Sequence, residues 1–126
     1  MLLTGIDLVE IERIAKSLES EAFLKRVYGE TEQKQLEQLR GKAKNESAAA
    51  FFAAKEAFGK AIGCGIFGFS LSEVQVSHEK SGRPFLLLSG KALTLALDSG
   101  CEFALSLSHS DNYAVASVVA TSFKER

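Results

Sequence analysis

The chain has 126 residues, of which 46% are hydrophobic and 25% charged, a composition that predicts one globular domain over residues 1–126. Its net charge of −1 argues against a general nucleic-acid or polyanion binder. Asp7 and Glu10 interrupt the N-terminal apolar run and no later run approaches about 20 residues, so we expect neither signal peptide nor membrane span, and a cytoplasmic location. Two cysteines are too few for a disulfide framework, and with the two histidines they show no zinc-binding spacing.

Residues 2–9 are predicted to form a short strand, because apolar residues surround its single carboxylate, Asp7. Two roles are open for this carboxylate. Asp7 could cap a helix over residues 8–18, a common structural role for Asp at such a junction. Alternatively, it could be a metal ligand.

Residues 10–40 contain two or three amphipathic helical segments, whose ends are marked by Gly29 and Gly41. Their basic residues are Arg13, Lys16, Lys25 and Arg26. Acidic residues are mixed among them, so these charges could form either a solvated face or a docking surface.

A long helix is predicted from about Asn45, its candidate N-cap, to a Gly-rich end at Gly63 and Gly65, because alanine dominates the segment. Glu56 and Lys60 are neighbours at i, i+4 spacing on one side of this helix. They could form a solvated ion pair worth about 0.3 kcal/mol. They could also take part in chemistry, and the spacing alone does not decide between the two.

The pattern changes to a period of two after Gly68, which predicts a β-hairpin that turns at residues 80–82. Residues 90–100 are predicted to form a helix, and residues 101–121 two strands around a turn at 110–112. The expected fold class is therefore α+β, with an antiparallel sheet packed on the long helix.

Two segments resemble the signatures of the phosphopantetheinyl transferases, specifically of the small holo-acyl-carrier-protein synthase family. They are GIDLVEIERI at residues 5–14 and FAAKEAFGKAIG at residues 52–63, in the family's order and at a family-like separation. Two shorter matches are GRP at residues 82–84 and SLSHS at 106–110. One departure is Phe51, where many relatives carry Arg, so one phosphate contact would be missing or supplied by Lys42 or Lys44.

The resemblance implies a 4′-phosphopantetheinyl transferase-like fold and a magnesium-dependent transferase of fatty acid biosynthesis. The enzyme would move 4′-phosphopantetheine from coenzyme A to a serine of apo acyl carrier protein and release adenosine 3′,5′-bisphosphate. Asp7 and Glu56 would hold one Mg²⁺, an ion that one or two carboxylates and substrate phosphates usually bind. Lys60 would complete the catalytic set by stabilising phosphoryl charge. The base that deprotonates the serine stays open between Glu56 and a water molecule held by the metal.

The same resemblance implies contacts to coenzyme A, the co-substrate, from Lys42, Lys44, Phe52, Lys60, Gly63, Pro84 and His109. The acidic acyl carrier protein would dock near Arg13, Lys16, Lys25 and Arg26. The resemblance further implies a homotrimer with active sites between subunits.

Two other functions fit parts of the pattern. A hot-dog acyl-CoA thioesterase also wraps a sheet around a long helix, but it needs no paired metal carboxylates. A non-catalytic module that binds coenzyme A or acyl carrier protein is the other alternative. A Ser–His hydrolase would need a GxSxG nucleophile elbow, which the sequence lacks.

Overall fold

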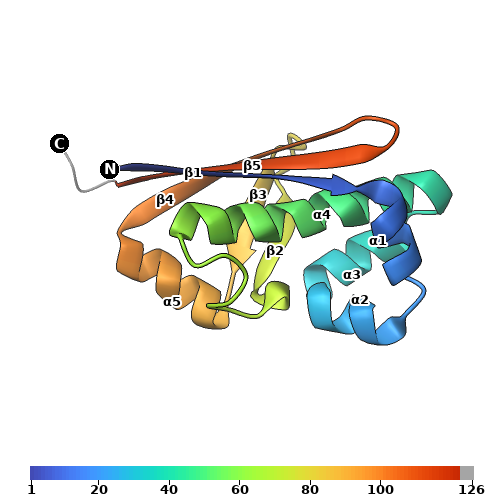
Figure 1. Cartoon of the computed structure of the whole chain (residues 1–126), viewed down its shortest axis with the longest axis horizontal. Coiled ribbons are helices and arrows are strands. Elements are labelled where there is room, and N and C mark those ends of the chain that lie inside the picture. Colours follow the sequence, from blue (N-terminus) through green and yellow to red (C-terminus); the bar gives the residue numbers. More distant parts are fainter. Residues whose placement is uncertain (123–126) are drawn as a thin grey trace.

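The computed structural model describes residues 1–122 and arranges them around one long helix. In chain order the elements are β1 (Leu2–Glu10), α1 (Ile11–Ser17), α2 (Glu21–Val27), α3 (Glu30–Glu37), α4 (Gly41–Ile62), the short 3-10 helix η1 (Leu71–Glu73), β2 (Val74–His78), β3 (Pro84–Leu88), α5 (Gly90–Ser99), β4 (Cys101–His109) and β5 (Tyr113–Ser122). Figure 1 shows α4 between a layer of three strands and a layer that contains β2, β3 and α5, with α1–α3 gathered near its N-terminal end. No helix within residues 1–122 is long and apolar enough to cross a membrane.

The strands form two antiparallel sheets, which confirms the predicted α+β class. The larger sheet has the order β1–β5–β4, and the smaller one is the β2–β3 hairpin. In the larger sheet Asp7 is paired with Ala116 of β5, while His109 of β4 is paired with Ala114. Strand β5 therefore separates Asp7 from His109.

The N-cap of helix α4 lies five residues before the predicted one. Arg40 is its N-cap and Gly41 its first residue, so Asn45 lies inside the helix and the predicted cap is wrong. The segment GKAK before Asn45 contains no proline, and lysine and alanine favour helix. The helix therefore extends backward through it.

The predicted strand at the N-terminus is confirmed, and it continues for one residue beyond the predicted end, to Glu10. Asp7 lies inside β1, and Glu10 is the N-cap of α1. The capping role of Asp7 is therefore wrong, because the helix begins at Ile11 instead of Leu8.

The C-terminal end of α4 turns sharply, as its glycines predicted. Gly63 is the C-cap with φ +98°, in the left-handed region that favours glycine, and Gly65 has φ +62°. The carbonyl oxygen of Gly59 accepts hydrogen bonds from the N–H groups of Gly63, Cys64 and Gly65. The chain after α4 is thereby held close to the end of the helix.

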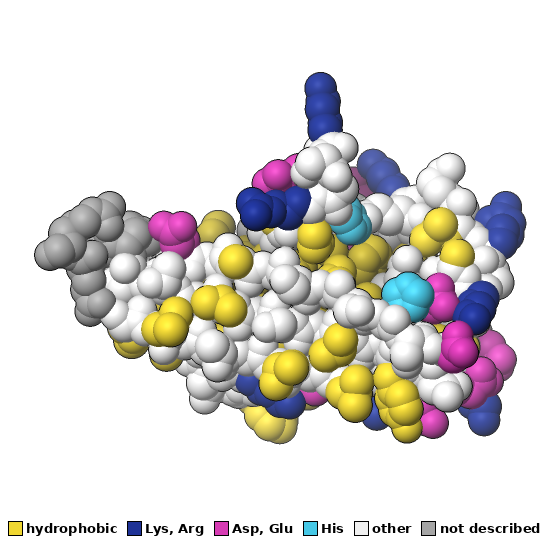
Figure 2. Space-filling model, turned by 90° about the horizontal axis from the view of Figure 1, so that it is seen from above, with side chains coloured by type: hydrophobic (Ala, Val, Ile, Leu, Met, Phe, Trp, Pro, Cys, Tyr) yellow, Lys and Arg dark blue, Asp and Glu magenta, His cyan; other side chains and the backbone are white. Residues whose placement is uncertain are grey.

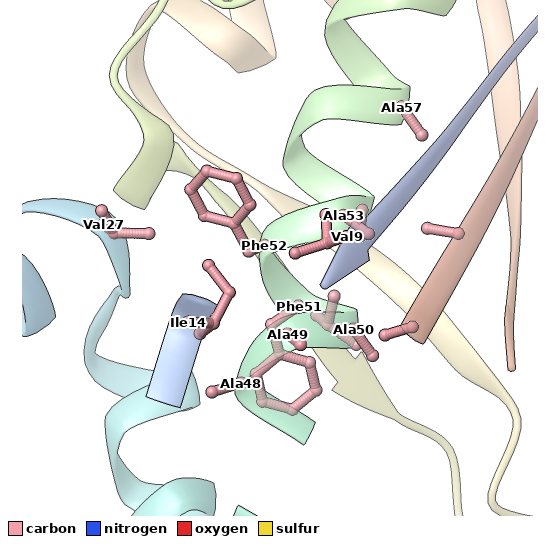
Figure 3. Packing of buried hydrophobic residues seen from close by; sticks show 14 of the residues in the cluster. Val9, Ile14, Val27, Ala48, Ala49, Ala50, Phe51, Phe52, Ala53 and Ala57 are labelled. Carbon is pink, nitrogen blue, oxygen red and sulfur yellow. The ribbon is translucent and has the colours of Figure 1, made fainter. Parts of the chain in front are cut away.

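The main hydrophobic core lies along residues 48–61 of α4. Figure 3 shows Ile14 of α1 and Val27 of α2 beside Phe52, with Val9 of β1 on the strand that passes α4. The alanines at positions 48, 49, 53, 54 and 57 are fully buried. Their small side chains allow the backbones of α4 and the sheet to approach each other closely.

The backbones of β1 and α4 approach each other closely at Gly5 of β1. A Cβ atom added to Gly5 would overlap the carbonyl oxygen of Ala57 and lie 2.7 Å from the amide nitrogen of Ala61. Glycine is therefore required at position 5 by the packing of β1 on α4. Asp7 follows two residues later, on the same side of the strand.

We expect Gly5→Ala to lower the free energy of unfolding by about 3 kcal/mol, because the methyl group must push β1 away from α4. The control is Lys91→Ala, since Lys91 is exposed on α5, away from β1, and should change stability by less than about 0.5 kcal/mol. Urea denaturation of both variants measures the difference. Equal stability of the two variants would contradict the close approach.

Candidate active site

Three of the predicted site residues meet where β1 crosses α4. Asp7 comes from β1, and Glu56 and Lys60 come from successive turns of α4. Lys60 Nζ lies 3.1 Å from Asp7 Oδ1 and donates a hydrogen bond of 3.0 Å to the carbonyl oxygen of Ile6. We refer to Asp7, Glu56 and Lys60 as the carboxylate–lysine centre.

The pairing within this centre differs from the simplest sequence interpretation. The direct partner of Lys60 is Asp7, and not its helical neighbour Glu56. The side chain of Asp7 is 14% exposed and that of Lys60 is 53% exposed. The ammonium group is therefore anchored at β1 while it remains accessible to a bound molecule.

The electrostatics of the centre are dominated by two neighbouring acids. Burial raises the pKa of the Glu56 carboxyl, and the charge of Asp7 raises it further. The charges of Lys60 and Arg13 act in the opposite direction. The negative charge of ionised Glu56 is therefore only partly balanced by Lys60 and Arg13. An additional cation beside Asp7 and Glu56 would balance it more fully.

The donor set fits a hard divalent cation that completes its shell with other oxygen ligands. Within residues 1–122 no group of three or more His, Cys, Asp or Glu side chains is placed to enclose a metal ion. A carboxylate pair without soft ligands suits Mg²⁺, which commonly keeps waters and substrate phosphates as its remaining ligands. Such a site is an open one, in which a phosphorylated molecule would contribute ligands.

The other predicted contacts to coenzyme A lie in different places. His109, at the end of β4, has its Nδ1 atom 3.6 Å from Glu46 Oε2 of α4. Lys42, in the first turn of α4, is 3.4 Å from Asp111 in the turn after β4. Lys44 is half-buried in the same first turn. These three residues lie near the beginning of α4, about three to five turns before Glu56 and Lys60.

Three more predicted residues lie elsewhere again. Pro84 opens β3 and lines a hollow of about 420 Å³ between β3 and β4. Phe52 is 8% exposed and stacks on Phe23 in the core. Gly63, at the end of α4, is exposed and lies less than one turn beyond Lys60. Within one chain, therefore, only some of the residues predicted to contact coenzyme A lie close to the carboxylate–lysine centre.

The departure at Phe51 has a structural consequence. Phe51 is 3% exposed, and its ring lies 6.4 Å from that of His78. Together with His78 and His109 it lines a hollow of about 240 Å³. The side chain at position 51 thus contributes apolar surface to this hollow, without a charge.

The predicted docking residues all lie on the surface. Arg13 and Lys16 are exposed on α1, and Lys25 and Arg26 are exposed on α2. Lys25 and Arg26 also line a hollow of about 440 Å³ beside η1. We call these four residues the basic surface; it begins close to the carboxylate–lysine centre, because Arg13 acts on Glu56.

A buried ion pair next to the centre was missed by the sequence analysis. Lys55 and Glu32 are both 0% exposed, and Lys55 Nζ lies 2.6 Å from Glu32 Oε1. A lysine among alanines and phenylalanines was the available signal. Its partner, Glu32, could not be identified because it lies 23 positions away in a helix with ordinary charged residues.

Comparisons with known proteins identify the family to which the chain is similar. The family model of the 4′-phosphopantetheinyl transferase superfamily matches residues 4–118. A holo-[acyl-carrier-protein] synthase of Caldanaerobacter subterraneus is 39% identical over 123 residues, which cover 94% of each chain. One of Treponema denticola is 42% identical over 116 residues, covering 91% of this chain and 94% of its own.

A solved structure gives the same result for the fold. The crystal structure of a holo-(acyl-carrier-protein) synthase from Bacillus anthracis, in complex with CoA (3′,5′-ADP), superposes with a TM-score of 0.82 at 36% identity, covering 95% of this chain and 96% of that one. The motifs at residues 5–14 and 52–63 both lie within the matched region. The chain therefore belongs to the holo-[acyl-carrier-protein] synthase family of the 4′-phosphopantetheinyl transferase superfamily, and is an enzyme of the transferase class.

Proposed function

We propose that this chain transfers the 4′-phosphopantetheine group of coenzyme A to a serine of apo acyl carrier protein, with release of adenosine 3′,5′-bisphosphate. The observation that carries the proposal is the meeting of Asp7, Glu56 and Lys60 where β1 crosses α4. The comparison proteins are holo-[acyl-carrier-protein] synthases, and one of them binds coenzyme A (3′,5′-ADP). A loaded carrier protein would serve fatty acid biosynthesis in the cytoplasm.

Asp7 and Glu56 would hold Mg²⁺ through their carboxylates. When bound, the ion would neutralise the pyrophosphate of coenzyme A and polarise the phosphoryl group that is transferred. Both carboxylates sit on rigid elements, a strand and a helix, which keeps their separation fixed. A thioesterase would have no use for this pair.

Lys60 would stabilise negative charge on the transferring phosphoryl group or on the leaving group. Its hydrogen bond to the Ile6 carbonyl oxygen and its contact with Asp7 hold the ammonium at β1, so little reorganisation is required when charge develops. Glu56, whose pKa is raised by burial and by Asp7, is also suited to accept a proton from the attacking serine.

The basic surface would receive the acidic carrier protein. Its position supports this, since Arg13 lies near enough to Glu56 to affect its charge, and α1 follows β1 directly. A carrier protein docked on Arg13 would therefore present its serine beside the carboxylate–lysine centre.

The enzyme would be a homotrimer with active sites between subunits. The outer face of the β1–β5–β4 sheet supports this, because large apolar side chains are exposed on it (Figure 2). They include Leu2 at 68%, Ile6 at 63%, Leu8 at 64% and Tyr113 at 45%. Apolar faces of this kind mark interfaces. A second copy could also bring the surface around Pro84 and His109 to the centre of the first.

The transfer itself is tested by mass spectrometry of apo acyl carrier protein incubated with coenzyme A, Mg²⁺ and this protein. We expect the carrier to gain one phosphopantetheine group, and EDTA to prevent the gain. Asp7→Asn and Glu56→Gln should remove most activity, and Lys60→Ala should lower kcat about 100-fold, with melting temperatures near that of the wild type. Lys91→Ala, an exposed lysine on α5, is the control.

Two results would contradict the proposal. A carrier protein of unchanged mass would exclude the transfer, and free thiol released from acyl-coenzyme A instead would favour a thioesterase. A wild-type kcat in Lys60→Ala would show that Lys60 forms only a surface ion pair and does not stabilise phosphoryl charge.

The docking surface is tested by Arg13→Glu and Lys25→Glu. Each should raise KM for the carrier protein about tenfold and leave KM for coenzyme A nearly unchanged, and added salt should weaken carrier binding to the wild type in the same way. Lys80→Glu is the matched control, because it makes the same charge change at the tip of the β2–β3 hairpin. Equal effects on both substrates would remove these residues from docking.

The oligomeric state is tested by light scattering. We expect a mass of three times the 13.6 kDa chain for the wild type, and a smaller mass for Ile6→Glu because the charge would be placed on the apolar outer face. A wild-type monomer with full activity would contradict a shared active site.

A further inference from the structure

The buried pair of Lys55 and Glu32 connects three elements at the residue that precedes Glu56. Glu32, on α3, accepts hydrogen bonds at Oε1 from Lys55 Nζ at 2.6 Å and from the Gly29 N–H at 3.2 Å. Its Oε2 accepts the N–H of Val76, on β2, at 2.8 Å. Lys55 Nζ also donates to the carbonyl oxygen of Val74 at 2.6 Å. The pair thus joins α3, β2 and α4.

These contacts are directional, unlike the apolar packing of α4 against the larger sheet. That packing is made mainly by alanines, whose small side chains interlock little with their neighbours. Charge-assisted hydrogen bonds of 2.6 Å permit little displacement of either partner. Lys55 is therefore held in one position relative to α3 and β2.

A fixed Lys55 determines where Glu56 points. Consecutive residues of an α-helix are turned by about 100°, so the anchoring of Lys55 toward β2 sets the direction of the next side chain. Glu56 lies one turn before Lys60, which contacts Asp7 and the Ile6 carbonyl oxygen, so Glu56 is on the side of α4 that faces β1. A small rotation of α4 about its axis would move the Glu56 carboxylate away from Asp7.

We infer that Lys55 and Glu32 are positioning residues, whose buried pair fixes the rotation of α4 and holds the Glu56 carboxylate beside Asp7. The inference rests on the proposed function, in which these two carboxylates act together. The charges themselves are not required for stability, since replacing a buried ion pair by well-packed apolar residues is often neutral or stabilising, whereas removal of one partner is costly.

The experiment uses the double variant Lys55→Met/Glu32→Gln, which removes both charges and keeps similar side-chain lengths. We expect a folded protein with a lower melting temperature, because the carbonyl oxygen of Val74 and one of the backbone N–H groups bound by Glu32 lose their partners, together with a kcat lower by about tenfold or more and an unchanged KM for the carrier protein. Binding of Mn²⁺ alone to the protein, measured by electron paramagnetic resonance, should weaken by at least about threefold, because the two carboxylates no longer face each other.

A second variant, Glu32→Asp, keeps both charges and withdraws the anchor by one methylene. It covers the case in which the double variant does not fold, and should show the same losses of kcat and Mn²⁺ affinity. The control is Lys34→Met/Glu30→Gln, which removes an exposed ion pair of 3.5 Å on the same helix and should leave both quantities at the wild-type value.

A folded double or Glu32→Asp variant in which either kcat or Mn²⁺ affinity stays within about twofold of the wild type would overturn the positioning role. That result would leave the proposed transfer intact. Conversely, a wild type that does not modify apo carrier protein contradicts the proposed function, whatever the variants bind.

Discussion

The packing of β1 directly on the backbone of α4 is the constraint on which the candidate site depends. It requires glycine at position 5, where any Cβ would overlap the carbonyl oxygen of Ala57, and a buried alanine surface on the helix. Since side chains alternate along a strand, Asp7 follows Gly5 on the side that faces α4. The contact between β1 and α4, which closes the core, therefore also places the Asp7 carboxylate near Glu56 and Lys60.

The charges around this contact are divided between two sites with different roles. Lys55 and Glu32 satisfy each other in the interior, together with backbone groups of β2, and leave no charge to bind a ligand. In the carboxylate–lysine centre Lys60 contacts Asp7 directly, and the charges of Lys60 and Arg13 balance that of Glu56 only in part, since burial and Asp7 raise its pKa. Two carboxylates whose charge is only partly balanced suit a divalent ion and phosphates. The buried pair of Lys55 and Glu32 would keep Glu56 beside Asp7.

Local patterns predicted most of the elements, and long-range contacts account for what they missed. Periodicity identified β1, the β2–β3 hairpin, α5 and the final two strands, because the spacing of apolar residues is a local signal even for β1, which pairs with the distant β5. The start of α4 was wrong because Asn45 can cap a helix or lie within one. Lys55 and Lys60 look alike in the sequence, yet one is fully buried on Glu32 and the other reaches Asp7. Only the packing of α4 against α3 and β1 distinguishes them.

The central claim is that Asp7 and Glu56 hold one divalent ion against the phosphates of coenzyme A, beside Lys60. The most direct measurement is a crystal structure of the protein with coenzyme A and Mn²⁺, using the anomalous signal to locate the metal. We expect one peak in contact with both carboxylates and with a phosphate oxygen, and Lys60 Nζ within hydrogen-bond distance of a phosphate. A metal bound elsewhere, or coenzyme A bound with its phosphates away from Lys60, would contradict the account.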